Sequence, residues 1–337
     1  MAGTTTVALA AAVSKAGALG SLGLGHLSTA QAQVQIQALK AATDKPFNVN
    51  FFCHQPAQPS PALEKKWLTL LEPFFTEFSA SPPTQLVVSY QTAFHNPELI
   101  AMLCAERPAV VSFHFGLPEP EAITALKQAG IQVWGCATTL HEALTLQQAD
   151  VDAIVAQGIE AGGHRGVFDA TQDKEIGLMA LLAQLQEPIS LPIIAAGGIM
   201  DGAGIAAALQ LGAQGVQMGT AFILCPESAA DTNYRASLQS AAALDTAITA
   251  VISGRPARGI KNRMHTEVAE FSAYLPDYPI AYSAAKALHA AASAHSNSDF
   301  AAHWAGQGAP LARALPARDL IAVLSAELAA AQSQSHH

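Results

Sequence analysis

Residues 191–225 read LPIIAAGGIMDGAGIAAALQLGAQGVQMGTAFILC, and this stretch determines the fold that we expect. Pro192–Ala196 is a short apolar run typical of a buried strand, and it stops at two glycines. Asp201 is placed to cap a helix over Gly202–Leu211, and Gly215–Met218 then reads as a second short strand. Two successive units of strand, turn and helix predict part of a parallel α/β sheet.

Both strands stop at glycine-containing turns, Gly197-Gly198 and Gly219-Thr220. Glycine lets backbone N–H groups approach an anion closely, and the N-terminus of a following helix adds a favourable dipole. In a (β/α)8 barrel, the loops after strands seven and eight often form a phosphate site at the catalytic face. The alternative is that these glycines only make tight turns, but two such turns in adjacent units favour phosphate binding.

The same alternation of strands and helices extends back through the chain. Apolar runs predict further strands, as expected for a sheet covered on both faces, at Gly20–Gly23, Phe47–Phe52, Ala109–Phe113, Ile131–Cys136 and Ala153–Gln157. With the two strands above, this makes seven, whereas a closed barrel needs eight. Either Leu86–Tyr90 is the eighth strand, or the first strand is absent from this sequence and precedes Met1 in the natural protein.

The alternation breaks after Cys225, and Pro226–Ala292 reads as mostly helical, with loops at Ser253–Asn262 and Leu275–Pro279. We therefore expect an α/β fold, a (β/α)8 TIM barrel whose first strand is missing, with a second, mostly helical domain inserted near the C-terminus. The expected boundaries are 1–224 for the barrel, 225–295 for the helical domain that covers the substrate, and 296–337 for a segment returning to the barrel, with a helix over Asp319–Ala330.

Composition excludes several classes of function. The net charge of −9 argues against a nucleic-acid partner, and no apolar run reaches the roughly 18 residues that a membrane helix needs. Val7–Val13 is apolar but short, and no basic segment precedes it, so a signal peptide is not expected. The four cysteines are far apart, and His336-His337 reads as a tail, so we expect no metal site and reduced thiols in the cytoplasm.

Two histidines follow predicted strands and therefore belong at the catalytic face. His164 lies in the glycine-rich loop QGIEAGGHRG, residues 157–166, where an imidazole has room to meet a ligand and suits proton abstraction. His114 follows the strand Ala109–Phe113. For both residues, the alternative is a structural histidine that only forms hydrogen bonds with the backbone. For His114 taken alone, this structural role is the favoured interpretation.

Three further features carry weaker signals. Asn50, near a strand end, is suited to bonding a cofactor but also to capping a loop. The loop GRPARG, residues 254–259, carries two arginines that either reach an anion or pair with surface acids, which is the usual role. Tyr278, Tyr282 and Lys286 are four residues apart and share one helix face, as in any amphipathic stripe.

The motifs QGIEAGGHRG, AAGGIMDGAGIAAALQLGAQGVQMGTAF and SGRPARGI resemble those of class I nitronate monooxygenases, once called 2-nitropropane dioxygenases. The resemblance runs from Ala2 to about Lys286, with AAAVSKAGALGSLG, FNVNFF and VSFHFGLP in family order. It implies an FMN-dependent TIM barrel with a helical domain over the flavin. Such enzymes oxidise alkyl nitronates with O₂ to a carbonyl compound and nitrite, and propionate 3-nitronate is their usual substrate.

The resemblance also implies roles for individual residues. His164 matches the catalytic histidine, and His114, Tyr278, Tyr282 and Lys286 match positions that line the substrate pocket. The family's FMN contacts match Asn50, Gln157, Gly162, Gly198, Gln217, Met218, Gly219 and Thr220. Family members begin with a strand ending in a Pro-Met-Ala/Gly turn, and Met1-Ala2-Gly3 resembles the end of that turn. We expect a monomer or homodimer that acts on a small nitronate without metal, nucleic acid or membrane.

Three alternatives remain at this point. A related FMN barrel oxidises NADH with a quinone or enoyl acceptor, and the arginine that follows the histidine in AGGHRG favours the monooxygenase over it. A flavin-free lyase or isomerase would bind a sugar phosphate at the same glycine turns. A non-catalytic module would bind flavin without turning over nitronates.

Overall fold

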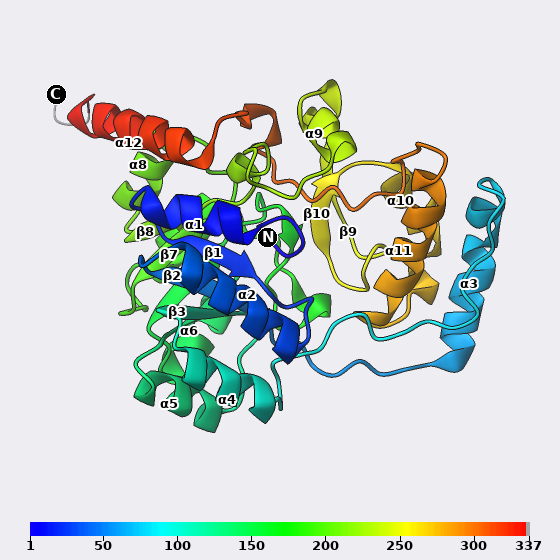
Figure 1. Cartoon of the computed structure of the whole chain (residues 1–337), viewed down its shortest axis with the longest axis horizontal. Helices are drawn as coiled ribbons and strands as arrows, with labels where there is room; N and C mark the ends of the chain where they lie inside the picture. Colours follow the sequence, from blue (N-terminus) through cyan, green and yellow to red (C-terminus); the bar gives the residue numbers. More distant parts are fainter. Residues whose placement is uncertain (335–337) are drawn as a thin grey trace.

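The computed structural model describes residues 1–334, so His336-His337 lie outside the described residues. Its centre is a curved sheet of seven parallel strands in the order β1-β2-β3-β4-β5-β7-β8 (Figure 1). All seven predicted strands are present, with ends shifted by at most one residue. They are β1 (Gly20–Gly23), β2 (Phe47–Phe52), β3 (Val110–His114), β4 (Gln132–Ala137), β5 (Ala153–Gln157), β7 (Ile193–Ala196) and β8 (Gly215–Gln217).

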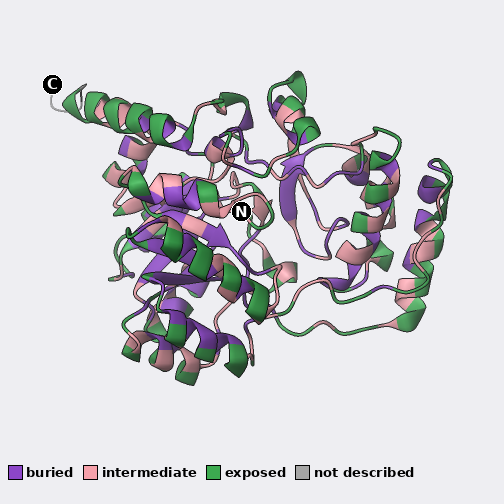
Figure 2. Cartoon of the chain, in the orientation of Figure 1, coloured by how far each residue is buried: buried purple, intermediate pink, exposed green. Residues whose placement is uncertain are grey.

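Helices cover the outer face of this sheet, and their starts follow ordinary capping chemistry. Ser28 and Gln31 form a reciprocal capping box at the start of α2, and Asp201 accepts a hydrogen bond from the Gly204 amide at the start of α8. Figure 2 shows most of the sheet buried and the outward helix faces exposed. The helices are α1 (Val7–Lys15), α2 (Thr29–Ala42), α4 (Pro97–Glu106), α5 (Pro120–Gln128), α6 (Leu140–Gln148), α7 (Leu178–Leu185) and α8 (Gly202–Gln210).

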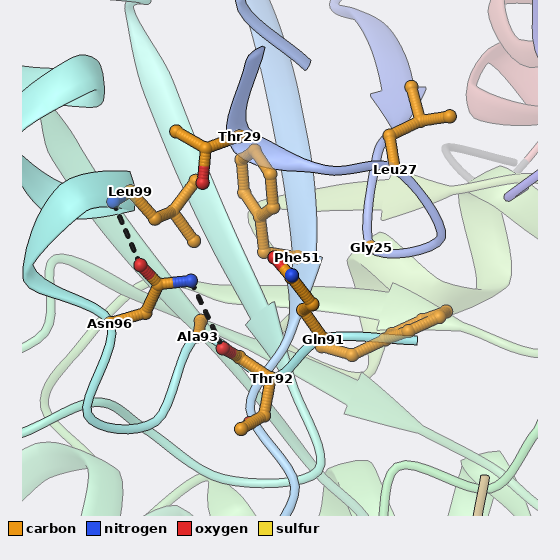
Figure 3. Close-up of a pocket in the computed structure, with 10 residues that line it drawn as sticks. Gly25, Leu27, Thr29, Phe51, Gln91, Thr92, Ala93, Asn96 and Leu99 are labelled. Atoms are coloured by element: carbon orange, nitrogen blue, oxygen red, sulfur yellow. Dashed lines mark hydrogen bonds between the residues drawn. The ribbon is translucent and has the colours of Figure 1, made fainter. Parts of the chain in front are cut away.

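Leu86–Tyr90 is not a strand, so it does not supply the eighth strand of a barrel. The segment after it instead crosses the end of β2, where the Ala93 amide donates to the Phe52 carbonyl at 2.7 Å. Figure 3 shows Asn96 at the end of this segment, with its carbonyl oxygen capping the Leu99 amide of α4. The hollow beside it measures about 10 Å³, which is room for roughly one water molecule.

The sheet is open between its two edge strands, β1 and β8, throughout the described chain. Met1 lies between the ends of these strands: a Cβ added at Gly23 would lie within 2.9 Å of Met1 and Ala2 backbone atoms, and one added at Gly219 would lie 3.5 Å from the Met1 side chain. The first turn therefore occupies the gap at the mouth of the sheet, although no strand pairs β1 with β8 there.

A second layer stands beyond the carboxyl ends of the strands, and we call it the cap (Figure 1). Part of it was predicted as a loop over 253–262, and this is wrong. β10 (Ala257–Ile260) pairs antiparallel with both β9 (Thr246–Thr249) and the two-residue β6 (Gly163–His164). Local propensity did not reveal this sheet, because β9 and β10 are only four residues long each and its third strand, β6, comes from about 90 residues earlier in the chain.

The rest of the cap is helical. Its helices are α3 (Pro61–Thr76), α9 (Thr232–Leu238), α10 (Arg263–Thr266) and α11 (Ile280–Ser293). α3 comes from the N-terminal half of the chain, yet its Trp67 and Phe75 share one hydrophobic cluster with Leu288 of α11. The predicted final helix is present as α12 (Ala317–Gln334), which packs on α8 and α1. Within the described residues, no helix is both long and apolar enough to cross a membrane.

Candidate active site

One cavity of about 630 Å³ lies at the carboxyl ends of the parallel strands and continues toward the open side of the sheet. Its volume is typical of sites that hold a cofactor or drug-sized ligand. Both glycine turns predicted from the sequence line it. So do most of the predicted site residues, namely Asn50, His114, Gln157, Gly162, His164, Gly198, Gln217, Met218, Gly219, Thr220 and Tyr282.

Two predicted residues, Tyr278 and Lys286, lie behind this lining. Tyr278 is buried, and its ring stands 5.5 Å from the His164 ring, so it contacts the site through that imidazole. Lys286 is exposed, and its ammonium lies 4.4 Å from the Tyr90 ring centroid and 4.8 Å from that of Tyr282. Lys286 therefore lies against two aromatic rings that line the cavity, at the outer side of the site.

His164 reaches the cavity because β6 holds its backbone against Ala257 of β10. Its Nε2 lies 2.8 Å from the buried Ser253 Oγ, which in turn lies 3.2 Å from the Arg255 carbonyl. When the hydroxyl proton points to that carbonyl, Nε2–H donates to Ser253 and Nδ1 carries the free lone pair. Burial lowers the pKa of His164 to about 3, so the imidazole is neutral near pH 7.

His114 occupies the end of β3 and has a different role. Its Nε2 lies 3.1 Å from the His164 carbonyl, and because a carbonyl only accepts, Nε2 carries the proton. Burial lowers the pKa of His114 to about 4. His114 is therefore a neutral donor that fixes the backbone of the His164 loop.

Gln157, at the end of β5, also holds that loop. Its Nε2 donates to the His164 carbonyl at 3.0 Å, and its Oε1 accepts from the Gly166 amide at 2.8 Å and from Arg165 at 3.0 Å. Arg165 is fully buried and pairs with Asp173 at 2.8 Å. The side chain of Gln157 is thus oriented by the loop, with one amide hydrogen left for a ligand.

The segment 296–308 forms another wall of the cavity. Trp304 stands 5.4 Å from the His164 ring, and Gly306 meets Gly162 so closely that a Cβ on Gly162 would lie 2.5 Å from the Gly306 nitrogen. The Gly306 amide also donates to Thr220 Oγ1 at 3.0 Å. The sequence predicted only that residues 296–337 return to the barrel, because single tryptophan and glycine residues carry no local motif.

Two aromatic residues near the site were also missed. Tyr90 lines the cavity from the segment before α4. Phe115 follows β3 with φ at +78°, a region that bulky side chains rarely adopt, and its ring lies 5.7 Å from that of His164. The sequence FHFG marks the end of a strand, but it does not reveal this backbone conformation.

The match to known proteins covers nearly the whole chain. The family model described as nitronate monooxygenase matches residues 1–327. A nitronate monooxygenase of Pseudomonas aeruginosa is 53% identical, with 97% of this chain and 94% of that protein covered. A nitronate monooxygenase of Paraburkholderia phytofirmans is 52% identical over 97% of this chain and 90% of that protein.

This chain belongs to the nitronate monooxygenase family. The structures agree, since a nitroalkane oxidase from Streptomyces ansochromogenes superposes with a TM-score of 0.89 at 36% identity, covering 98% of this chain and 94% of that one. FabK from Thermotoga maritima gives a TM-score of 0.73 at 27% identity, covering 100% and 93%. Membership in a nitronate monooxygenase family makes the chain an oxidoreductase with a TIM-barrel-like fold.

The cavity also fits the flavin that this family implies. Glycines at the ends of β7 and β8 border the same space, and Gly198, whose φ of +67° favours glycine, has no side chain to cover its amide. Trp134 Nε1 is a buried donor without a partner at the cavity wall. Gln217 is exposed even though it ends a strand of the central sheet. An unpaired donor and an uncovered strand end indicate a ligand in this space.

Proposed function

We propose that this chain oxidises alkyl nitronates with O₂ to a carbonyl compound and nitrite, with FMN as its cofactor and propionate 3-nitronate as the expected substrate. One observation carries the proposal: a single cavity contains both glycine turns and His164. Bound FMN would supply the redox chemistry by taking electrons from the nitronate.

The backbone amides of Gly198, Gly219 and Thr220 would hold the FMN phosphate. The remaining predicted contacts, Asn50, Gln157, Gly162, Gln217 and Met218, would surround the rest of the cofactor. The amide nitrogen of Asn50 already donates to Ser112 Oγ at 2.9 Å, so its carbonyl oxygen is the atom left for a ligand. These residues bind and orient, and none of them needs to exchange a proton.

His164 is the residue that moves a proton. A neutral nitroalkane must lose its α-proton, and the lone pair on His164 Nδ1 can accept it while Nε2–H remains bonded to Ser253. A nitronate has already lost that proton, so it needs the pocket but not the base. His114, Tyr282 and, through the His164 ring, Tyr278 complete the proposed substrate site, with Lys286 at its outer side.

An anaerobic titration tests the proposal. Purified protein should be yellow, and adding ethyl nitronate without O₂ should bleach the visible flavin absorbance. Admitting O₂ should restore the absorbance and release nitrite. A colourless protein would favour a flavin-free lyase or isomerase, and a yellow protein that is inert to nitronates would favour a flavin-binding module without this activity.

A second candidate follows from the likeness to the Thermotoga maritima FabK structure at 27% identity. A flavin enzyme of that kind would take its electrons from NADH and pass them to a quinone or enoyl acceptor. Anaerobic mixing with NADH separates the two functions. Rapid bleaching by NADH, with no bleaching by ethyl nitronate, would support the reductase.

A further inference from the structure

The motif SGRPARGI contributes two arginines that sequence reasoning placed most readily at the surface, and this is wrong. Arg255 is 8% exposed and Arg258 is 6% exposed. In the part of the chain that the structure describes, no carboxylate oxygen lies within 4.0 Å of either guanidinium. Buried cations without a paired anion are costly and therefore call for a functional explanation.

Arg255 is held by neutral groups. Its Nη2 donates to the backbone carbonyls of Val167 and Phe168, whereas its Nε has no partner. The guanidinium carbon lies 4.5 Å from the centroid of the Phe115 ring and 6.0 Å from that of Tyr278. The guanidinium is thus held in place by carbonyl groups and ring faces, and because these partners are neutral they do not neutralise its positive charge.

The same two rings touch the catalytic imidazole. Phe115 and Tyr278 lie 5.7 Å and 5.5 Å from the His164 ring, each nearly edge-on. The backbone amide of Arg255 also bonds Ser253 Oγ at 3.3 Å, the oxygen that holds His164 Nε2. Hydrocarbon rather than water therefore separates the guanidinium from His164, so its field is weakly screened.

The other charges around the site do not cancel this field at His164. The titratable groups that face the imidazole are His114, His54 and the phenol of Tyr278, with no carboxylate among them. The carboxylates that act on Arg255 are Asp277, Asp169 and Glu142, all beyond ion-pair distance. Burial is the main cause that lowers the pKa of His164. The charges of neighbouring groups, Arg255 among them, lower it further.

We propose that Arg255 determines the charge preference of the substrate pocket, favouring an anionic nitronate over the neutral nitroalkane of the same carbon skeleton. This rests on the proposed function. Proton abstraction breaks the α-C–H bond, moves the proton to His164 and leaves the electron pair on the nitro group as a nitronate. The fixed positive charge stabilises that anion whether it is formed in the pocket or enters from solution.

The test compares three variants. Arg255→Met removes the charge but keeps the length, Arg255→Lys keeps the charge, and Arg258→Met is the matched control. Arg258 is equally buried and unpaired, but its Nε donates to the Ile159 carbonyl and it does not act on His164. KM and kcat are measured for ethyl nitronate and for nitroethane, together with flavin content and melting temperature.

Arg255→Met should raise KM for ethyl nitronate about tenfold and change KM for nitroethane by less than about twofold, because only the anion senses the charge. Arg255→Lys and Arg258→Met should keep the wild-type ratio of the two KM values. An equal change for both substrates in Arg255→Met, or the same selective change in Arg258→Met, would overturn the proposal. If Arg255→Met does not fold, Arg255→Lys provides the test. A changed ratio of the two KM values in Arg255→Lys, at a wild-type melting temperature, would also overturn the proposal.

A readout without turnover keeps this proposal separate from the proposed function. NMR titration of the His164 imidazole should show its pKa raised in Arg255→Met and unchanged in Arg258→Met. Wild-type protein that turns over neither substrate would overturn the proposed function, whereas an unmoved His164 titration in Arg255→Met would overturn the role of Arg255.

Discussion

The parallel sheet and the cap contribute to the site in different ways. The sheet offers the amide groups of the glycine turns after β7 and β8, together with polar side chains at its strand ends such as Asn50 and Gln157. The cap offers side chains: Ser253, Arg255 and Trp304 surround His164 from sequence-distant segments. Binding of a cofactor should thus depend on the sheet, and selection of a substrate should depend on the cap.

The sharpest test of the sheet is Gly219→Val. The backbone of Gly219 has φ at −109°, and a Cβ would meet the Met1 side chain at an ordinary 3.5 Å, so the fold should tolerate the change. The new side chain should block approach of the phosphate and give largely apo protein. Flavin absorbance per protein measures this, with Gly204→Ala as a control on α8 outside the cavity lining. Wild-type flavin content in Gly219→Val would remove this turn from the phosphate site.

His164→Asn tests the proposed base, whose side chain β6 of the cap sheet places in the cavity. Turnover of neutral nitroalkanes should fall by roughly 10²–10⁴, the usual contribution of a general base, while nitronates should be impaired much less. Steady-state rates with nitroethane and ethyl nitronate give the comparison. Equal losses for both substrates would show that His164 acts by position or charge rather than as a base.

Lys286→Met tests the outer side of the cap. Its ammonium stacks on the Tyr90 and Tyr282 rings, and cation–π contacts of this kind are worth about 0.5–1 kcal/mol at exposed sites. We expect KM for propionate 3-nitronate to rise a few-fold and KM for ethyl nitronate, which has no carboxylate, to stay the same. A rise for both would indicate that the lysine supports Tyr282 and does not attract the carboxylate.

A further prediction concerns acid stability, which depends on two buried histidines of the cap side of the site and not on a ligand. Burial lowers the pKa of His54 and of His303 to about 4 in the folded protein, whereas the pKa of an ordinary, unburied histidine is 6.5. The unfolded chain therefore binds more protons between pH 6.5 and 4, and stability is full above pH 6.5 and falls on acidification. Each histidine should contribute about 1.4 kcal/mol per pH unit in this window. Melting curves of His303→Asn between pH 7 and 5 should show a shallower slope than wild type.

The sequence predicted the parallel sheet well, because each strand is a local apolar run that ends at a glycine or polar residue. The resemblance located His164, and the structure brings it to the same cavity as the glycine turns. Burial of Arg255 escaped prediction because it rests on the distant Val167 and Phe168 carbonyls, and the strand Ala257–Ile260 escaped because it has only four residues and pairs with both β9 and β6. Trp304 and Phe115 were missed for a related reason: their roles arise from a returning segment and from an unusual backbone angle, and neither is encoded in a local pattern.

The final helix has a mechanical consequence. β1 and β8 share no hydrogen bonds with each other, but α12 packs against both α1 and α8. The Arg313 side chain bonds Glu327 of α12 and also the Met200 carbonyl, which follows β7. The two edges of the sheet are thus connected through helix packing and side-chain hydrogen bonds, and not through backbone hydrogen bonds between strands. Each of these two edge strands is bonded to a single neighbour, so in hydrogen exchange the amides of β1 and β8 should exchange ahead of those in β3 and β4, which have a bonded strand on both sides.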